Sequence, residues 1–165
     1  MSYIKTMTSA FAMAALGLLG ACSPSVTWTD YSYKAHHFAA AFTAPPKVTA
    51  DEQPFLVEQN DGEVDFGVTA ACNIVTDKSP DQMMADAIEG TRLNGTVRNV
   101  VYTALGGTMG REMLVDRTGG PTIKQRLFVH GGCLYLIFAG TKDGADDERV
   151  AHFWIRSAFS RAVLE

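Results

Sequence analysis

The chain has 165 residues, of which 47% are hydrophobic and 19% charged, and its formal net charge is −4. This composition is typical of a folded globular protein and argues against a disordered or fibrous chain. Because the 14 basic residues are outnumbered by 18 acidic ones and are dispersed, with 124–126 as the densest basic run, we expect no nucleic-acid partner.

Residues 1–21 have the pattern of a bacterial lipoprotein signal peptide. Lys5 precedes an apolar segment, 10–19, which is about half as long as a membrane-spanning helix requires. The sequence LGAC at 19–22 resembles a lipobox, in which two small residues precede a cysteine that receives lipid. We therefore predict cleavage before Cys22, lipid on its sulfur and a short tether over 22–27. An ordinary signal peptide cut at the same bond is the alternative.

Lipid on Cys22 has consequences for location. A diacylglyceryl thioether plus an acylated amine gives several chains, and several chains hold a protein on a bilayer stably. Ser23 stands where Asp is the residue that retains some proteobacterial lipoproteins at the inner membrane. We therefore expect a membrane-attached protein of the cell envelope that faces the periplasm, at the outer membrane if the host is Gram-negative.

The folded domain is expected over 28–165, and it begins with an aromatic-rich hairpin. Trp28, Tyr31, Tyr33, Phe38 and Phe42 recur with the spacing of structured chain, and Pro45 and Pro46 follow. Two consecutive prolines fix φ and remove backbone donors, so the chain turns there at an edge.

A strand and a helix are predicted next. Residues 63–75 alternate, with Phe66 and Val68 on one face, and this period of two indicates a strand. Ser79 then offers an N-cap hydroxyl, Pro80 suits the first turn, and Gln82 completes a capping box. The helix is expected to run about four turns and to end near residues 94–95.

The second half of the sequence predicts an antiparallel meander followed by a C-terminal helix. Glycine pairs suit the turns between extended runs, because such turns need positive φ. The expected strands are 97–105, 111–117, 122–129 and 133–139. An acidic turn over 143–148 opens a C-terminal amphipathic helix, on which Val150, Phe153, Trp154, Ser157 and Ala158 have helical spacing.

Four segments in this order resemble one family. They are FTAPPK at 42–47, GTMGREM at 107–113, RLFVHGGCLYLI at 126–137 and DERVAHFWIRSAF at 147–159. The chain resembles the PsbP-like or DcrB-like envelope proteins, which have the Mog/PsbP-like fold. The resemblance implies an α+β fold, an αβα sandwich in which an antiparallel sheet is covered by helices. It also implies a non-enzymatic accessory or binding module, and it transfers no site residue.

Two cysteines remain in the domain after Cys22 is acylated. Cys72 lies in the strand predicted over 63–75, and Cys133 opens a later strand. An oxidising compartment permits a disulfide, but bridging needs Cα atoms within about 7 Å of each other. Two alternatives stay open, namely a Cys72–Cys133 disulfide and two buried free thiols, and a domain of this size favours the thiols.

The sequence HGGC at 130–133 resembles parts of two catalytic sites. Cys133 beside His130 has the residue types of a nucleophile and its base, and HGG resembles an esterase oxyanion loop. The chain has no G-x-S-x-G elbow, and the loop supplies no orienting Asn or Asp. We interpret the segment as a hairpin turn and expect no enzyme, with a small periplasmic thiol enzyme or hydrolase using Cys133 and His130 as the alternative.

Four histidines lack the spacing of a metal site. His36, His37, His130 and His152 form no H-E-x-x-H frame. The adjacent His36 and His37 would point to opposite faces of an extended chain. We expect no metal and no cofactor. A periplasmic metal or small-ligand carrier, with a pocket lined by His36 or His37, is the third functional alternative.

The leading hypothesis is a lipid-anchored envelope module that binds another envelope protein, whose identity the sequence does not give. Arginines on adjacent predicted strands could form a cationic face for an acidic partner, although surface charge is also the normal covering of an antiparallel sheet. These are Arg98, Arg111, Arg117 and Arg126.

Overall fold

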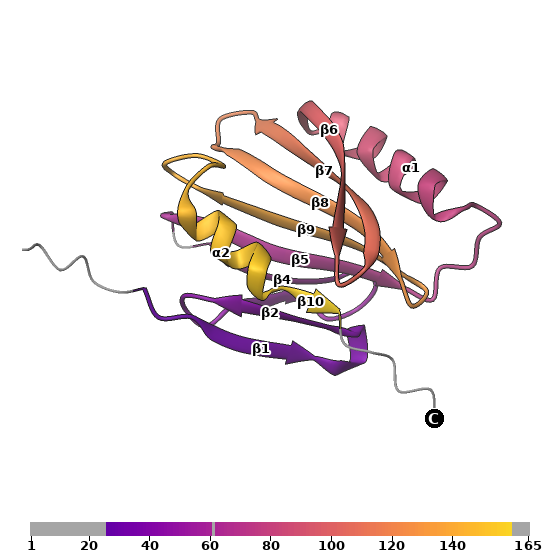
Figure 1. The fold of residues 1–165 in the computed structure, drawn as a ribbon, viewed down its shortest axis with the longest axis horizontal. Helices are drawn as coiled ribbons and strands as arrows, with labels where there is room; N and C mark the ends of the chain where they lie inside the picture. The colour runs from indigo at the N-terminus through magenta and orange to yellow at the C-terminus, as the bar shows by residue number, and fades with distance from the viewer. Residues whose placement is uncertain (1–25, 61, 160–165) are drawn as a thin grey trace, which may run out of the picture.

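The structure is a computed structural model that describes residues 26–60 and 62–159 (Figure 1). The predicted leader and Cys22 lie outside the described residues. The helices are η1 (Lys34–His36), a 3-10 turn, α1 (Pro80–Arg92) and α2 (Glu148–Arg156). The strands are β1 (Thr29–Tyr33), β2 (Phe38–Phe42), β3 (Lys47–Ala50), β4 (Phe55–Asn60), β5 (Val64–Cys72), β6 (Gly95–Leu105), β7 (Thr108–Arg117), β8 (Thr122–His130), β9 (Cys133–Thr141) and β10 (Ala158–Phe159).

The strands form two antiparallel sheets. The large sheet has seven strands in the order β3-β4-β5-β9-β8-β7-β6, and the small sheet has three in the order β1-β2-β10. Helix α1 covers one face of the large sheet, while α2 and the small sheet cover part of the other face (Figure 1). The predicted α+β class, with helices on an antiparallel sheet, is confirmed. Neither helix of the described chain has the length and apolar character needed to cross a membrane.

The N-terminal hairpin forms as predicted. β1 pairs with β2 from Thr29 opposite Phe42 to Tyr33 opposite Phe38. The β3–β4 hairpin was not predicted, because β3 is only four residues long and its side chains are largely exposed, so it has no clear alternation. It extends the large sheet at one edge.

Helix α1 begins at the predicted cap. The Ser79 hydroxyl accepts a hydrogen bond from the Gln82 amide at 3.3 Å, and the Gln82 side-chain oxygen accepts one from the Ser79 amide at 2.8 Å. This reciprocal pair satisfies two donors that a helix start leaves without partners. Met84 and Ile88 on the inner side of α1 are buried in a cluster with Met113, Ile123 and Leu127 of the sheet.

The meander also forms as predicted, with β6, β7, β8 and β9 adjacent in chain order. The two-residue turns at 106–107 and 131–132 have positive φ at both glycines, which is the requirement that favours glycine there. Along β8, side chains alternate between the two faces of the sheet. Ile123 and Leu127 pack on the α1 side, whereas Phe128 belongs to the core on the α2 side.

The C-terminal helix is shorter than predicted. α2 ends at Arg156, and Ser157 is extended with φ −81° and ψ 135°. Ala158 then pairs with Ala39, and Phe159 with Phe38, as strand β10 against β2. The predicted helical continuation through Ser157 and Ala158 is therefore wrong, because the free edge of β2 offers backbone hydrogen bonds that the helical spacing alone does not reveal.

Candidate functional site

The structure joins Cys72 and Cys133 in a disulfide, with their Cα atoms 4.0 Å apart. The two residues are directly opposite in the β5–β9 pair, and Cys133 is 1% exposed. Of the two alternatives that the sequence left open, the described chain therefore has the bridge.

His130 lies beside the β8–β9 turn but does not face a free thiol. Its Nδ1 is 3.0 Å from the Thr108 hydroxyl oxygen, and its ring stacks on Phe159 with centroids 4.9 Å apart. The Cys133 sulfur is bonded to Cys72, and a disulfide sulfur has no thiolate to act as nucleophile. The geometry gives no support to a thiol enzyme that uses Cys133 and His130.

The histidines are spread over the fold, and the rings of His36, His130 and His152 each stack on a different aromatic side chain. His36 stacks on Phe55 at 3.9 Å, and its burial, followed by the charge of His37, lowers its pKa. His36 and His37 are not on an extended chain as expected, since His36 ends η1 and His37 has φ 55°. His152 stacks on Trp28 at 4.6 Å. Within the described part of the chain, no three His, Cys, Asp or Glu side chains gather as metal ligands.

The four arginines that could have formed a cationic face each have a carboxylate partner. The pairs are Arg98–Asp116, Arg111–Asp81, Arg117–Asp65 and Arg126–Glu112. The Arg98 pair is bidentate, and hydrogen bonds from Arg98 and Thr122 lower the pKa of Asp116 to about 2. These pairs neutralise the arginines, so the four do not form a cationic face.

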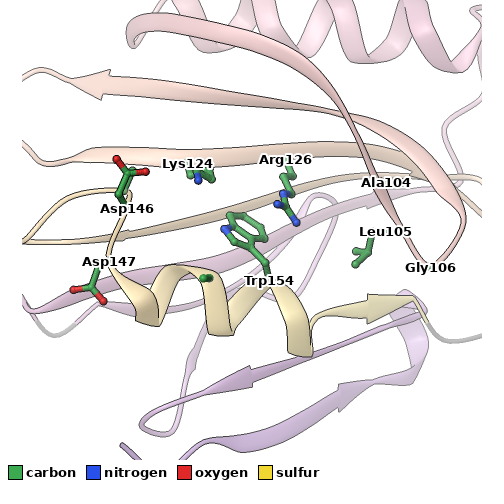
Figure 2. Close-up of a pocket in the computed structure, with 10 residues that line it drawn as sticks. Ala104, Leu105, Gly106, Lys124, Arg126, Asp146, Asp147 and Trp154 are labelled. Atoms are coloured by element: carbon green, nitrogen blue, oxygen red, sulfur yellow. The ribbon is translucent and has the colours of Figure 1, made fainter. Parts of the chain in front are cut away.

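A cavity of about 490 Å³ lies between the large sheet and α2 (Figure 2). Its floor is β8, one wall is α2 with the loop before it, and the other wall is the end of the β6–β7 hairpin. The lining residues are Ala104, Leu105, Gly106, Lys124, Arg126, Ala145, Asp146, Asp147, Ala151 and Trp154.

The strand period places two cations on the floor of this cavity. Lys124 and Arg126 are two residues apart on β8, so they share a face, and both line the cavity. The Arg126 guanidinium carbon lies 4.5 Å from the centre of the Trp154 ring, a cation–π contact. Arg126 Nε also donates to the Glu112 carboxylate at 2.6 Å. Lys124 has no ion pair within residues 26–60 and 62–159, so its charge is uncompensated by contact.

Trp154 brings a buried polar group to the same place. Its side chain is 94% buried, since the residue is 6% exposed, yet its indole nitrogen has no hydrogen-bond acceptor in the described chain. A buried donor without an acceptor loses its bond to water and gains none in exchange. Figure 2 shows this nitrogen on the Lys124 side of the ring.

The loop before α2 carries the acidic end of the cavity. Asp147 caps the helix, and its carboxylate accepts hydrogen bonds from the Arg149 amide at 2.8 Å and from the Arg149 guanidinium at 2.7 Å. The Arg149 side chain is the main cause that lowers the pKa of Asp147 to about 2. Asp146 is exposed and has no ion pair among the described residues.

A second surface lies at the free edge of β6. β6 ends the large sheet, and its one charged residue, Arg98, is paired with Asp116. Four apolar side chains on β6 and the adjoining end of β7 are exposed by 40% to 71%, namely Val100, Val101, Tyr102 and Met109. We call these four residues the β6 apolar strip. Solvent-facing apolar residues gathered in this way often mark an interaction surface.

Comparisons with known proteins identify the fold. No protein-family model matches the sequence, and no curated protein matches it. The solution structure of cyanobacterial PsbP (CyanoP) from Synechocystis sp. PCC 6803 is similar, with a TM-score of 0.54 and 11% sequence identity. The match covers 87% of this chain and 99% of that one. The chain therefore has a PsbP-like fold, as the sequence segments predicted.

The cavity itself was not predicted from the sequence. Lys124 and Arg126 were visible as part of the densest basic run, and Trp154 as part of the predicted C-terminal amphipathic helix. The spacing of two residues between Lys124 and Arg126 was the one sequence signal that placed both cations on a single face of a strand. Nothing local showed that α2 and the β6–β7 hairpin enclose that face.

Proposed function

We propose that this protein is a lipid-anchored, non-enzymatic binding or accessory module of the cell envelope. The observation that carries the proposal is the β6 apolar strip on an unpaired edge strand. An edge strand presents a row of free backbone donors and acceptors to which another chain can add. The apolar side chains of the strip would be buried by such a partner. The PsbP-like fold agrees with a binding role but does not by itself specify one.

The partner is expected to be another envelope protein that covers β6. A photo-crosslinking amino acid in place of Tyr102, which is 71% exposed, would capture it in intact cells. The matched control is the same amino acid in place of Lys47, which is exposed on β3 at the opposite edge of the sheet. We expect a discrete adduct from position 102 and none from position 47. No adduct, or the same adducts from both positions, would contradict a partner at β6.

The membrane attachment rests on Cys22 and is tested separately. We expect labelled palmitate to enter the wild-type protein and to be lost in Cys22→Ala, which should leave the membrane fraction. The protein should face the periplasm, and in a Gram-negative host it should sediment with the outer membrane. Label retained by Cys22→Ala would show that the lipid is elsewhere, and a wild type that takes up no label would indicate an ordinary signal peptide.

A further inference from the structure

We propose that the cavity over β8 binds a small organic carboxylate. The carboxylate group would be held by Lys124 and Arg126, and the apolar body of the ligand would lie against Leu105, Ala151 and Trp154. This site is separate from the β6 apolar strip and extends the proposed function to a small-molecule ligand.

The two cations supply donors in a suitable arrangement. Neighbouring residues on one face of a strand are roughly 6 to 7 Å apart along the chain, so both side chains can converge on one anionic group. Arg126 uses Nε for Glu112, and its terminal nitrogens make no hydrogen bond within the described chain. Lys124 lines the cavity and makes no hydrogen bond to the described residues, so its three donors are available to a ligand there.

Trp154 makes the site more than a pair of surface cations. Its ring holds the Arg126 guanidinium in place and gives the cavity an apolar wall. The indole N–H is unpartnered and closed off from solvent, so Trp154 contributes the face of its ring and its contact with Arg126 to this wall.

Charge and apolar surface together indicate the class of ligand. Glu112 neutralises Arg126 and Arg149 neutralises Asp147, so among the described residues that line the cavity the uncompensated charges are Lys124 and Asp146. Lys124 attracts an anion, and the apolar lining favours an anion that carries an apolar body over a fully polar one such as phosphate. The volume of about 490 Å³ is that of an ordinary small-ligand pocket. An organic monocarboxylate with an apolar body fits these features together.

The test uses Trp154 as its own reporter. The chain has two tryptophans, so a Trp28→Phe background leaves Trp154 as the single emitter. Benzoate is the probe, benzamide is its neutral counterpart and inorganic phosphate is an anion without an apolar body. We expect millimolar benzoate to change Trp154 emission saturably, with matching heat in calorimetry. Benzamide and phosphate should bind at least tenfold more weakly.

Lys124→Gln is the decisive variant, because Lys124 makes no ion pair with any residue that the structure describes, and its loss should leave the fold intact. A hydrogen bond to a charged group is typically worth a factor of about ten or more in binding, so we expect at least a tenfold weaker benzoate affinity. Lys47→Gln, on the far edge of the sheet, is the control and should bind like the background. Circular dichroism checks that each variant is folded.

Three results would overturn the proposal. They are no saturable response to benzoate in folded protein, equal affinity for benzamide, or an affinity unchanged by Lys124→Gln. None of them bears on crosslinking at position 102, so a failed ligand site and a failed docking edge can be told apart.

Discussion

Asp147 shows how one side chain joins two parts of the cavity wall. It caps α2 through the Arg149 amide, accepts a hydrogen bond from the Thr141 hydroxyl at 3.1 Å and pairs with the Arg149 guanidinium. Its side chain is 11% exposed, so these contacts replace most of its water. The negative charge is therefore favoured in the folded state, and the pKa falls to about 2.

The lowered pKa of Asp147 predicts a specific acid sensitivity. A carboxyl whose pKa is lower folded than unfolded stabilises the fold above its unfolded pKa, and that stabilisation is lost as the pH falls toward the folded pKa. The loss should therefore occur between the ordinary value of 3.8 and about 2. Asp147→Asn, which does not titrate, should flatten the pH dependence of the urea midpoint in this window. Asp116, whose pKa is also about 2, contributes to the pH dependence of stability in both the wild type and the variant.

Two further variants separate the charge of Asp147 from its capping role. Asp147→Ala also loses the cap and should cost about 0.5 to 2 kcal/mol at pH 7. Asp143→Asn removes a carboxylate that contacts the same Arg149 but is 61% exposed, and it should change stability little. An equal acid dependence in Asp147→Asn and wild type would show that Asp147 is not the group that titrates.

Gly110 and Gly90 are two glycines at which substitution by alanine should have opposite effects on stability. A Cβ at Gly110 on β7 would overlap the Leu127 carbonyl oxygen and the buried Phe128 ring, and backbone of the neighbouring strand cannot move aside cheaply. Gly110→Ala should therefore cost about 1 to 3 kcal/mol. Gly90 lies within α1, and a Cβ at this position would have nothing within 4 Å. Gly90→Ala should therefore stabilise the fold by about 0.5 to 1 kcal/mol. Urea unfolding of both variants measures the contrast, and a Gly110→Ala protein as stable as wild type would mean that β7 and β8 are not this close.

At the scale of elements, local signals explain which predictions succeeded. The capping box of α1 and the glycine turns of the meander are encoded within a few residues, so the sequence showed them directly. β10 and the β3–β4 hairpin were missed, because a two-residue or four-residue strand exists only where a neighbouring strand offers hydrogen bonds. The end of α2 was misplaced for the same reason, since pairing with Ala39 outweighs the helical spacing of Ser157 and Ala158.

A disulfide links β5 and β9 in addition to their backbone hydrogen bonds. The disulfide closes a segment with a sequence separation of 61, and loop-closure entropy for such a length corresponds to about 4 kcal/mol. The double variant Cys72→Ala, Cys133→Ala should lose about 2 to 5 kcal/mol in the free energy of unfolding. Reduction of the wild type should bring its urea midpoint to that of the variant. A midpoint that reduction leaves unchanged would indicate that the two thiols are not bridged in solution.

At the scale of the whole molecule, the candidate site depends on how separate elements meet. The sequence predicted the PsbP-like fold and the strand that carries Lys124 and Arg126. It did not predict the cavity, because Trp154 comes from α2 and Leu105 from the β6–β7 hairpin, and Leu105 reaches the α2 side only where that hairpin meets the core. Such an arrangement results from packing between elements, which has no local signature in the chain.

The covalent link between Cys72 and Cys133 also determines what happens when the backbone is cut. The ring that it closes contains α1, β6, β7 and β8. A protease that nicks the turn between β7 and β8 would leave two fragments joined through sulfur and still interlocked in the sheet. On a denaturing gel the nicked protein should migrate as one band without reductant and as two bands with it, so limited digestion reports the bridge without any substitution.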